Sequence, residues 1–474
     1  MKKHVITCLL TMIIVLAAFG QPKTVNILAV NDMHANIDLF PQFAAIADSL
    51  RAIDPDLLVL SAGDNRTGNP LNDMYTPSSY PMVALMNQVG FDGSTLGNHD
   101  FDAQSLPALI GLSNFRYICA NITAPDTMGI NTVPYKVFCP NGLKVGVIGA
   151  VQVNAKGRPD THPDNVKGIK FKPASEVVPE YEWLSRECDI TILLSHIGYE
   201  ADVEMAKACP WLDLIIGGHT HSQLASGENT DDVLITQNKN KLRHATHITL
   251  TVEDGRVTSK KAEYINVAKF PKKNKVVDGI VHFISDNPQF KEVLAEAETP
   301  FDNIEELGLM VCDAFREEGN ADIGIENRGG IRMESHPTGD ITILDVLEID
   351  PFYNMAVEMT LTGQQILELL KSYSRGSLDH FPHVSGMFCK VTTCKNDPMK
   401  IKEVKLFTTD GRKFDLKRSY RVITNSYVVA TCTAIPKGVA HTTNIETSDM
   451  IMRFLKKKGK VNYQGAKYLR IKQE

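Results

Sequence analysis

The sequence predicts a layered α/β domain followed by a second domain of α+β type. In the first half of the 474-residue chain, short apolar runs recur and end abruptly in polar residues, whereas the second half has helix and strand signals of its own. The composition, 43% hydrophobic and 22% charged, is that of a globular protein and excludes a disordered chain, a collagen-like sequence and a coiled-coil rod. At roughly 150 residues per domain, the length accommodates two or three domains.

Residues 1–20 have the plan of a cleavable secretory signal. Two lysines precede the apolar stretch Val5–Phe19, and the small residues Ala18 and Gly20 come before the expected cleavage point. The stretch is shorter than the roughly 20 apolar residues of a spanning helix, although an uncleaved anchor remains the alternative. We therefore expect an exported chain with no transmembrane helix after signal removal.

The charge of the chain argues against a nucleic-acid polymer as partner. The formal net charge is −6, and it becomes −8 without residues 1–20, because that segment contains two lysines and no acidic residue. A basic footprint is therefore absent, and we interpret the lysines at 456–460 as a solvated helix end. Outside the signal, eight of the nine cysteines remain. They allow 105 pairings, so the disulfide pattern stays open.

Residues 24–265 are predicted to form the α/β domain. Continuous apolar runs of four to eight residues are typical of strands buried on both faces. Between the first two runs, apolar residues recur at helical spacing from Phe43 to Ile53, which predicts a strand, a helix and a strand in succession. The predicted strands are Val25–Val30, Leu57–Leu60, Val145–Ile148, Ile190–Leu194 and Leu214–Ile216.

A lysine-rich segment, 266–298, is interpreted as a linker with a helix over Val276–Leu294. The second domain is expected to span 299–474. There Thr362 and Gln365 have the spacing of a capping box, ahead of apolar residues on one helical face. Strands are predicted at Met355–Leu361 and Ser419–Ile423.

Residue types that bind metals follow the predicted strands of the first domain. A single histidine at a strand end is more often a hydrogen-bonded structural residue than a metal ligand. Five blocks of this kind, each following an apolar run in one domain, are hard to explain by chance. The candidates are Asp32, His34, Asp64, Asn98 within Gly97-Asn98-His99-Asp100, His196, His219 and His221.

These residue types are suited to two divalent cations. Two such ions roughly 3.5–4 Å apart need an anionic ligand between them, and we expect Asp64 to be that bridge. Imidazoles together with hard oxygen donors favour Zn, Mn or Fe. Neighbouring glycines at 63, 97, 217 and 218 let several loops approach one point. A cation pair of this kind binds phosphoryl oxygens and generates a hydroxide for in-line attack.

The same blocks resemble those of the calcineurin-like metallophosphoesterases. The block Gly97-Asn98-His99-Asp100-Phe101-Asp102 narrows the resemblance to the 5′-nucleotidase family. The second half is similar to that family through Asn327–Arg332, Pro351-Phe352-x-Asn354 and Phe381-Pro382-x-Val384-Ser385-Gly386. The resemblance implies an α-β-β-α sandwich, a C-terminal substrate-binding domain, and release of phosphate from nucleoside 5′-monophosphates in nucleotide catabolism.

The resemblance also implies a role for each residue. Asp32, His34, Asp64 and His221 would hold one metal, and Asp64, Asn98, His196 and His219 the other. His99 would lie by the leaving-group oxygen with Asp102 orienting its ring, although Asp102 could instead cap a helix. Arg328 and Arg332 would bind phosphate oxygens, and Phe381 would stack on a nucleobase. The alternatives are surface arginines on a turn and a core phenylalanine.

Two departures from the family pattern leave the substrate open. Residues 428–433 lack the Gly-Gly-Asp-Gly turn expected beside the second stacking aromatic, and 237–241 lack the usual glycines. Cyclic nucleotides, sugar nucleotides or other phosphoesters are therefore alternative substrates, and a metal-holding binding protein without turnover is a remote one. Asn65-Arg66-Thr67 forms a glycosylation sequon beside Asp64. A glycan there would obstruct the metals, which favours a bacterial periplasm or cell surface.

Overall fold

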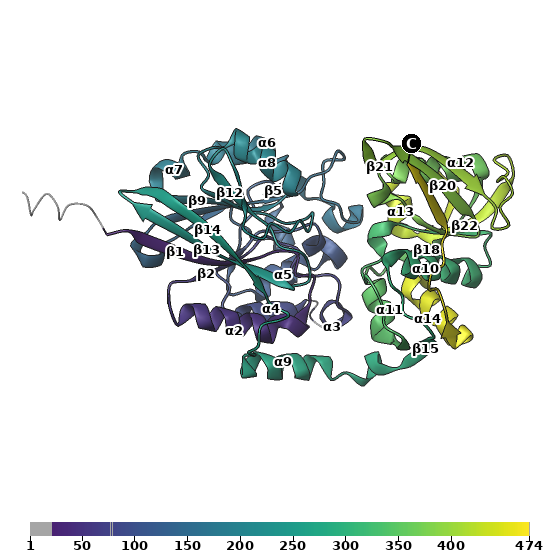
Figure 1. The fold of residues 1–474 in the computed structure, drawn as a ribbon, viewed down its shortest axis with the longest axis horizontal. Helices are drawn as coiled ribbons and strands as arrows, with labels where there is room; N and C mark the ends of the chain where they lie inside the picture. The colour runs from purple at the N-terminus through teal and green to yellow at the C-terminus, as the bar shows by residue number, and fades with distance from the viewer. Residues whose placement is uncertain (1–20, 76, 78, 474) are drawn as a thin grey trace, which may run out of the picture. The chain divides into compact units, whose positions relative to one another are not determined.

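The computed structural model describes residues 21–75, 77 and 79–473, so the expected signal segment lies outside the described residues. The chain divides into two compact units (Figure 1). Unit 1 contains residues 21–67 and 71–285, and unit 2 contains 286–473 together with 68–70. Each unit is described by itself below.

Unit 1 is built on two six-stranded sheets. The strands of the first are, in order, β14 (Arg256–Asn266), β13 (His244–Glu253), β1 (Lys23–Val30), β2 (Leu58–Ser61), β3 (Gly93–Ser94) and β4 (Arg116–Tyr117). Those of the second are β11 (Glu228–Thr230), β12 (Val233–Thr236), β10 (Leu214–Ile216), β9 (Ile190–His196), β7 (Val145–Val151) and β6 (Tyr135–Phe138). The five predicted strands correspond to β1, β2, β7, β9 and β10.

The two sheets pack face to face, with helices on their outer sides. Ile27, Leu60, Val147 and Ile192 belong to one buried cluster between the sheets. Figure 1 shows α2 (Phe40–Arg51), α4 (Tyr80–Val89) and α9 (Lys275–Ser285) on one side, and α6 (Ala174–Val177), α7 (Leu184–Glu187) and α8 (Tyr199–Ala208) on the other. This confirms the predicted α-β-β-α layering. The smaller elements are α3 (Pro70–Asp73), α5 (Leu106–Leu112), β5 (Ile122–Thr123) and β8 (Lys170–Phe171).

The helix predicted over Val276–Leu294 is shorter than expected. It ends at Ser285, and β15 (Val293–Ala297) follows as a strand of unit 2. Pro288 explains the early end, because a proline disfavours helical backbone in the residue before it and cannot continue the hydrogen-bond ladder. The segment 266–298 is therefore shared between the two units and is not a single helical linker.

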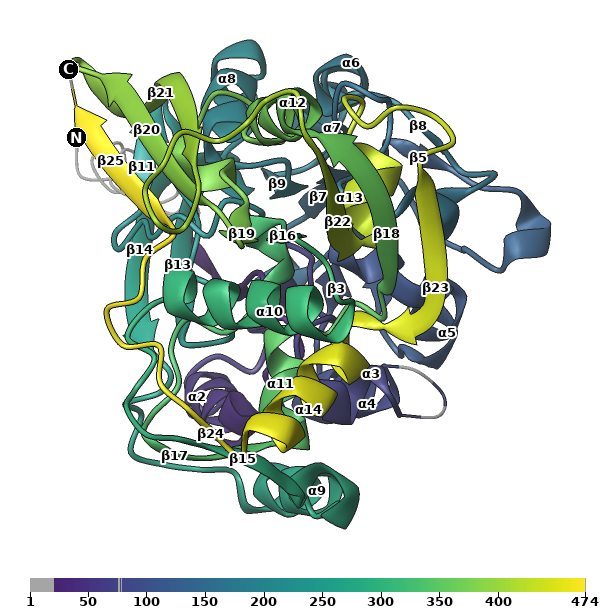
Figure 2. The ribbon, with the colours of Figure 1, turned by 90° about the vertical axis from the view of Figure 1, so that its right-hand side faces the viewer.

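Unit 2 contains one five-stranded and two three-stranded sheets. The strand order of the five-stranded sheet is β19 (His383–Ser385), β16 (Ile323–Glu326), β22 (Ser419–Asn425), β18 (Met355–Thr362) and β23 (Ala440–Glu446). One three-stranded sheet has the order β17 (Gly339–Thr342), β15 and β24 (Lys460–Val461). The other has the order β21 (Asp397–Phe407), β20 (Phe388–Cys394) and β25 (Leu469–Gln473). The helices are α10 (Ile304–Glu318), α11 (Ile343–Ile349), α12 (Gly363–Tyr373), α13 (Ser426–Thr431) and α14 (Thr447–Lys458), with α10 beside α14 (Figure 2).

The capping box predicted in unit 2 is present. The backbone N–H of Gln365 donates to the Thr362 hydroxyl, and the side-chain oxygen of Gln365 accepts from the backbone N–H of Thr362. The predicted strands around it are β18 and β22, which pair antiparallel. The α+β reading of the second half is thus confirmed.

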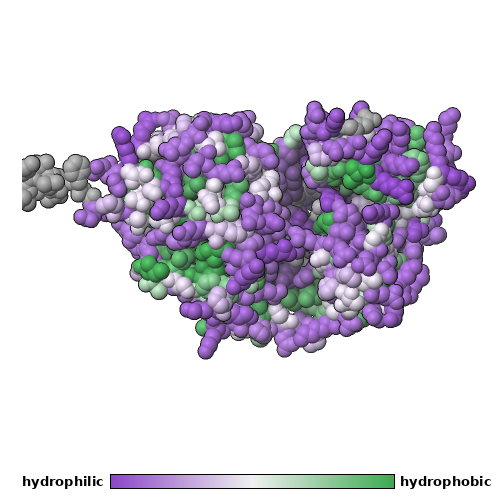
Figure 3. Space-filling view, viewed as in Figure 1, coloured by the Kyte–Doolittle hydropathy of each residue, from purple (hydrophilic) through white to green (hydrophobic). Residues whose placement is uncertain are grey.

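One face of the two units is mostly polar in Figure 3. On the face drawn in Figure 3, hydrophobic residues form small groups among hydrophilic ones. Over the described residues, no helix is both long and apolar enough to cross a bilayer.

A buried imidazole makes unit 2 sensitive to acid. The His383 ring lies against α10 where Gly308 leaves room for it, since a Cβ at 308 would stand 2.3 Å from the ring. Its Nδ1 is 2.6 Å from the Tyr468 hydroxyl. Burial, with a contribution from Arg328, lowers the pKa of His383 to about 3. The neutral ring therefore stabilises the fold fully above the unfolded pKa near 6.5, and this contribution is lost as pH falls toward 3.

We predict that lowering the pH from 7 to 5 reduces the free energy of unfolding by about 2 kcal/mol through His383 alone. Hydrogen exchange of the β16 and β19 amides at the two pH values measures this loss. His383→Gln, which cannot titrate, should show a pH dependence smaller by that amount. An unchanged pH dependence in the variant would contradict the assignment.

Candidate metal centre

The topology of unit 1 brings the predicted ligands to one edge of both sheets. β1, β2 and β3 run parallel in the first sheet, with Val30 opposite Ser61 and Ser61 opposite Ser94. In the second sheet β7, β9 and β10 are also parallel. Since the carboxyl ends of parallel strands meet at one edge, loops that are distant in sequence converge there. The seven candidates follow β1 (Asp32, His34), β2 (Asp64), β3 (Asn98) and β10 (His219, His221), or end β9 (His196).

Two groups of side chains in this cluster could each hold a metal ion. In one, His34 Nε2 lies 3.2 Å from His221 Nε2, and Asp32 Oδ1 lies 3.9 and 3.2 Å from those two atoms. In the other, His196 Nε2 lies 3.2 Å from Asp64 Oδ2 and 3.8 Å from Asp32 Oδ1. The two groups together contain five of the seven predicted ligands.

Both carboxylates lie at the centre of the cluster. Asp64 Oδ2 is 4.0 Å from His34 Nε2 as well as 3.2 Å from His196 Nε2, which is a position between the two groups. Asp32 Oδ1 lies within 4.0 Å of His34, His196 and His221. The sequence interpretation gave the bridging position to Asp64 alone, whereas in the structure Asp32 is equally central.

Asn98 and His219 lie next to the second group. His219 Nδ1 lies 2.9 Å from Asn98 Oδ1, and the rings of His196 and His219 meet edge to face with centroids 5.4 Å apart. The backbone N–H of His219 donates to the Asp32 carboxylate. These contacts link the loop after β10 to those after β1 and β3.

Hydrogen bonds to the second ring nitrogen turn the histidines toward the centre. His34 Nδ1 donates to Thr67 O at 3.0 Å, and His196 Nδ1 donates to Ala62 O at 2.6 Å, so that Nε2 of each ring faces the carboxylates. His221 Nδ1 contacts the Asn240 side chain at 3.2 Å. Asn240 lies in the segment 237–241, where the sequence departs from the family. That departure therefore supplies a support for His221.

The cluster is held in strained backbone. Five of its seven residues have positive φ: 48° for Asp32, 46° for His34, 51° for Asp64, 78° for His219 and 53° for His221. Non-glycine residues rarely adopt this region, which costs energy and is concentrated at functional sites. Backbone hydrogen bonds hold it, including Asp32 N–H to Gly63 O and His34 N–H to Asp64 O, both 3.0 Å.

Asp100 is a functional residue of the site that the sequence interpretation did not identify. Its buried carboxylate accepts the backbone N–H groups of Gly97 (2.8 Å), Asp64 (3.1 Å) and Asn65 (3.1 Å). It therefore fastens the loop after β2 to the loop after β3. Burial and the nearby Asp64 raise the pKa of Asp100 to about 7, against the effect of these N–H donors. Its place inside the Gly97–Asp102 block was the available sequence signal.

Gly97 has no room for a side chain. A Cβ at this position would stand 2.0 Å from Asp64 Oδ1 and 2.4 Å from the Asp64 backbone nitrogen. The glycine is therefore required by the close approach of the two loops.

The electrostatics of the cluster call for cations. Burial would raise the pKa values of Asp32 and Asp64, but His221 and His196 lower that of Asp32, and His196 and His99 lower that of Asp64 well below the usual range. Asp64 and Asp32 in turn overcome burial and raise the pKa of His196 to about 10. Burial and His196 lower the pKa of His219 to about 4. Two ionised buried carboxylates require compensating positive charge.

The donor set fits divalent metal ions. Among the described residues, His196 Nε2 is a buried nitrogen without a hydrogen-bond partner, and it points at the carboxylates. A ring nitrogen in that situation, beside carboxylate oxygens and other imidazoles, has the chemistry of a ligand atom.

His99 and Asp102 form a pair beside the cluster. His99 Nδ1 lies 2.7 Å from Asp102 Oδ2, and Asp102 Oδ1 accepts from the Thr161 hydroxyl at 2.7 Å. The rings of His99 and His34 are 5.3 Å apart. Burial would raise the pKa of Asp102, but His99 and, more weakly, Arg66 hold it below its usual range. Asp102 therefore stays ionised and fixes the orientation of the His99 ring.

The two arginines predicted to bind phosphate in unit 2 have different neighbours. Arg328 pairs with Glu305 at 2.7 Å, and the Arg332 guanidinium lies 5.9 Å from the centroid of the Phe352 ring.

The stacking role expected for Phe381 is not supported, because its ring is 1% exposed within a hydrophobic core. Phe352 is only partly buried beside Arg332, and the sequence interpretation gave it no role of its own. Its place in Pro351-Phe352-x-Asn354, one of the motifs noted above, was the available signal.

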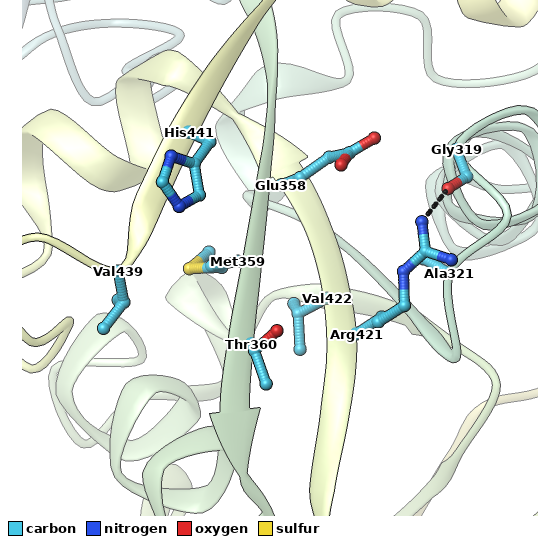
Figure 4. Close-up of a pocket in the computed structure, with 9 residues that line it drawn as sticks. All are labelled: Gly319, Ala321, Glu358, Met359, Thr360, Arg421, Val422, Val439 and His441. Carbon is cyan, nitrogen blue, oxygen red and sulfur yellow. Dashed lines mark hydrogen bonds between the residues drawn. The ribbon is translucent and has the colours of Figure 1, made fainter.

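Two surface cavities of unit 2 do not involve these residues. One, of about 260 Å³, lies over β18, β22 and β23, where Arg421 donates to Gly319 O (Figure 4). The other, of about 560 Å³, is lined by α10 and β20 residues. Neither is lined by Arg328, Arg332 or Phe352.

The fold and the clustered side chains are similar to those of calcineurin-like phosphoesterases. The family model described as calcineurin-like phosphoesterase matches residues 25–223, and the model described as 5′-nucleotidase, C-terminal domain, matches 289–436. The chain therefore contains the pair of domains that the sequence resemblance to the 5′-nucleotidase family predicted.

Individual relatives are similar to this chain over most of its length. The chain is 26% identical to a 5′-nucleotidase of Vibrio cholerae, covering 84% of this chain and 81% of that one, and 26% identical to UshA of Escherichia coli, covering 86% of each. It spans 32% of the trifunctional nucleotide phosphoesterase YfkN of Bacillus subtilis, at 25% identity over 85% of this chain.

Solved structures share the fold. A 5′-nucleotidase precursor from Thermus thermophilus has a TM-score of 0.84 at 22% identity, covering 95% of this chain and 99% of that one. The sulfate thiohydrolase SoxB of T. thermophilus has a TM-score of 0.76 at 18% identity, covering 91% and 82%. The fold alone therefore does not identify the ester that is cleaved.

We predict that Gly97→Ala disrupts the cluster, because its methyl group would overlap Asp64. Overpacking of this kind costs about 1–3 kcal/mol, measurable as a loss in the free energy of unfolding. Gly111→Ala in α5 is the matched control, since nothing lies within 4 Å of a Cβ there, and helix propensity favours alanine. Equal stabilities of the two variants would contradict the tight approach at Gly97.

Proposed function

We propose that the chain is an exported, metal-dependent phosphohydrolase that releases phosphate from nucleoside 5′-monophosphates. The observation that supports this most strongly is the convergence of Asp32, Asp64 and three histidines, His34, His196 and His221, beside the His99–Asp102 pair. The pair of matched domains and the nucleotidases among the relatives support the choice of substrate. Export is inferred from the plan of residues 1–20, and a bacterial periplasm or surface is the expected location.

Two divalent cations are proposed to be held by the predicted ligand sets, with Zn, Mn or Fe favoured by the mixture of imidazole and oxygen donors. When bound, such ions would supply Lewis-acid stabilisation of phosphoryl oxygens and activation of water near neutral pH. The strained loops and the Asp100 contacts keep the ligand atoms together, so that little rearrangement is needed for binding.

The protein's own contribution to the reaction centres on His99. Asp102 holds Nδ1 of the ring, which directs Nε2 away from the carboxylate and toward the position of a substrate. A donor fixed in this way stabilises negative charge that develops on the leaving-group oxygen. Thr161 and Arg66 keep Asp102 in place for that task.

Unit 2 is proposed to bind the rest of the substrate. Arg332 offers a guanidinium for phosphate oxygens, and Phe352 offers a partly exposed ring beside it for a base. Arg328 is a second candidate for phosphate binding, although its charge is already partly offset by Glu305.

A broader phosphoesterase is the second candidate. The residues that replace the Gly-Gly-Asp-Gly turn form α13, and Val428 in this helix is buried. This segment is therefore helical and has a different backbone from the glycine-rich turn that is expected beside the second stacking aromatic. Its helical backbone favours substrates, such as cyclic or sugar nucleotides, that need not be held between two aromatic rings.

We predict that the protein, stripped with a chelator and reloaded with Mn²⁺ or Zn²⁺, hydrolyses AMP faster than cyclic AMP or UDP-glucose. Substrates and products are separated and quantified by chromatography, because the first hydrolysis of cyclic AMP or UDP-glucose yields phosphomonoesters and no free phosphate, and the chelated protein should be inactive. His99→Ala should retain its metal content but lose about a hundredfold or more in kcat. Undiminished hydrolysis in the chelator, or no hydrolysis of any substrate after reloading, would contradict the proposal.

We predict that Phe352→Leu raises KM for AMP severalfold and leaves KM for phenyl phosphate unchanged, because only AMP has a base to stack. Phe381→Leu is the contrasting variant. It should reduce stability through loss of core packing without changing the ratio of the two KM values. A change of that ratio in Phe381→Leu, with none in Phe352→Leu, would restore the role first expected for Phe381.

A further inference from the structure

Arg66 is a fully buried cation next to the candidate metal centre. It follows Asp64 by two residues, and its side chain is 1% exposed. Burying a guanidinium is costly unless charged or polar partners compensate it. Its partners therefore indicate what the charge does at this position.

Two of those partners, Asp102 and Ser105, lie on or directly after the turn that carries Asp102, and the third, Asp73, ends α3. Arg66 Nη1 donates to the backbone carbonyl of Asp102 and to the Ser105 hydroxyl, the latter at 2.5 Å. Nη2 lies 3.4 Å from Asp73 Oδ1. Asp102 belongs to the 3₁₀ turn His99–Gln104, and Ser105 follows that turn directly. One guanidinium thus joins the loop after β2 to the segment that presents both His99 and Asp102.

The segment beside Arg66 makes further contacts with the same groups. The Thr67 hydroxyl donates to the His99 carbonyl at 3.3 Å, and the Thr67 carbonyl accepts from His34 Nδ1. The Thr67 N–H donates to Asp73 Oδ1 at 3.2 Å, the same oxygen that faces Arg66. Arg66 and Thr67 therefore connect a candidate ligand, His34, with the backbone of both members of the His99–Asp102 pair.

We propose that Arg66 is a positioning residue for His99. Its buried guanidinium fixes the Asp102 backbone and keeps a positive charge beside the Asp102 carboxylate, so that the carboxylate holds His99 in the orientation for donating to the leaving-group oxygen. This inference rests on the proposed phosphohydrolase function and adds a residue to its machinery. The favourable effect of Arg66 on the ionised form of Asp102 is consistent with it.

A role through His99 has a consequence that a purely structural role lacks. Stabilisation of the leaving-group oxygen matters most when that oxygen develops a large negative charge, as it does for phenolate. It matters little for 4-nitrophenolate, which leaves readily. Loss of Arg66 should therefore slow phenyl phosphate more than 4-nitrophenyl phosphate.

The test compares kcat/KM for phenyl and 4-nitrophenyl phosphate in the metal-loaded full chain. Arg66→Gln should lower the value for phenyl phosphate about tenfold more than the value for 4-nitrophenyl phosphate. Arg66→Lys, which keeps the charge, should recover part of that difference. The ratio between substrates is independent of the fraction of folded protein, so a loss of stability does not obscure it. Equal losses on both substrates would overturn the role.

A double variant and a matched control complete the design. Asp102→Asn should show the same substrate-dependent loss as Arg66→Gln, and the double variant should lose little more, because both residues act through His99. Independent, multiplying losses would overturn the inference. Arg51→Gln is the control, since Arg51 also binds backbone carbonyls in unit 1, those of Val89 and Gly90. Its substrate ratio should equal that of the unmodified protein.

These outcomes separate the inference from the function on which it rests. If the unmodified, metal-loaded protein hydrolyses both aryl phosphates and Arg66→Gln slows them equally, only the role of Arg66 fails. If the unmodified, metal-loaded protein hydrolyses neither aryl phosphate nor AMP, the proposed function fails and the inference fails with it.

Discussion

The architecture of unit 1 depends on holding two ionised carboxylates close together in a buried place. Asp32 and Asp64 both lie within 4.0 Å of His34 and His196. Their mutual repulsion and desolvation oppose folding, so the surrounding structure must compensate for both. Parallel strands aim the loops, strained backbone places the side chains, and Asp100 ties two loops together through three N–H groups. Such a centre attracts cations because its own residues leave negative charge incompletely balanced.

Much of this centre could be predicted because metal-binding residue types stand at the ends of predicted strands in the sequence. Seven ligand candidates follow or end apolar runs, and a strand exposes its last side chains at the sheet edge whatever the detailed packing is. Asp100 and Arg66 were not found, since an acceptor of backbone N–H groups and a buried cation are recognised by what surrounds them. Sequence does not record those surroundings, because most of the partners come from loops 35–39 residues away.

The errors in the second half have the same origin. Phe381 stands in a family motif, and a phenylalanine that packs in a core has the same local sequence as one that meets a ligand. Burial separated the two cases, with Phe381 inside a hydrophobic cluster and Phe352 partly exposed beside Arg332. The helix expected over Val276–Leu294 was too long because apolar spacing outweighed Pro288 in the prediction. The capping box at Thr362, by contrast, was found because its contacts are local.

The order of the ligands along the chain bears on how unit 1 can fold. His34 and His221 touch although 187 residues separate them, and each half of the centre comes from a different sheet. If only β1–β3 have assembled, the half-site contains the oxygen ligands of Asp32, Asp64 and Asn98. Of the four candidate imidazoles, those of His196, His219 and His221 are still missing. Closing such long-range contacts is slow. The imidazole half of the centre therefore forms only after β9 and β10 of the second sheet have packed against the first sheet.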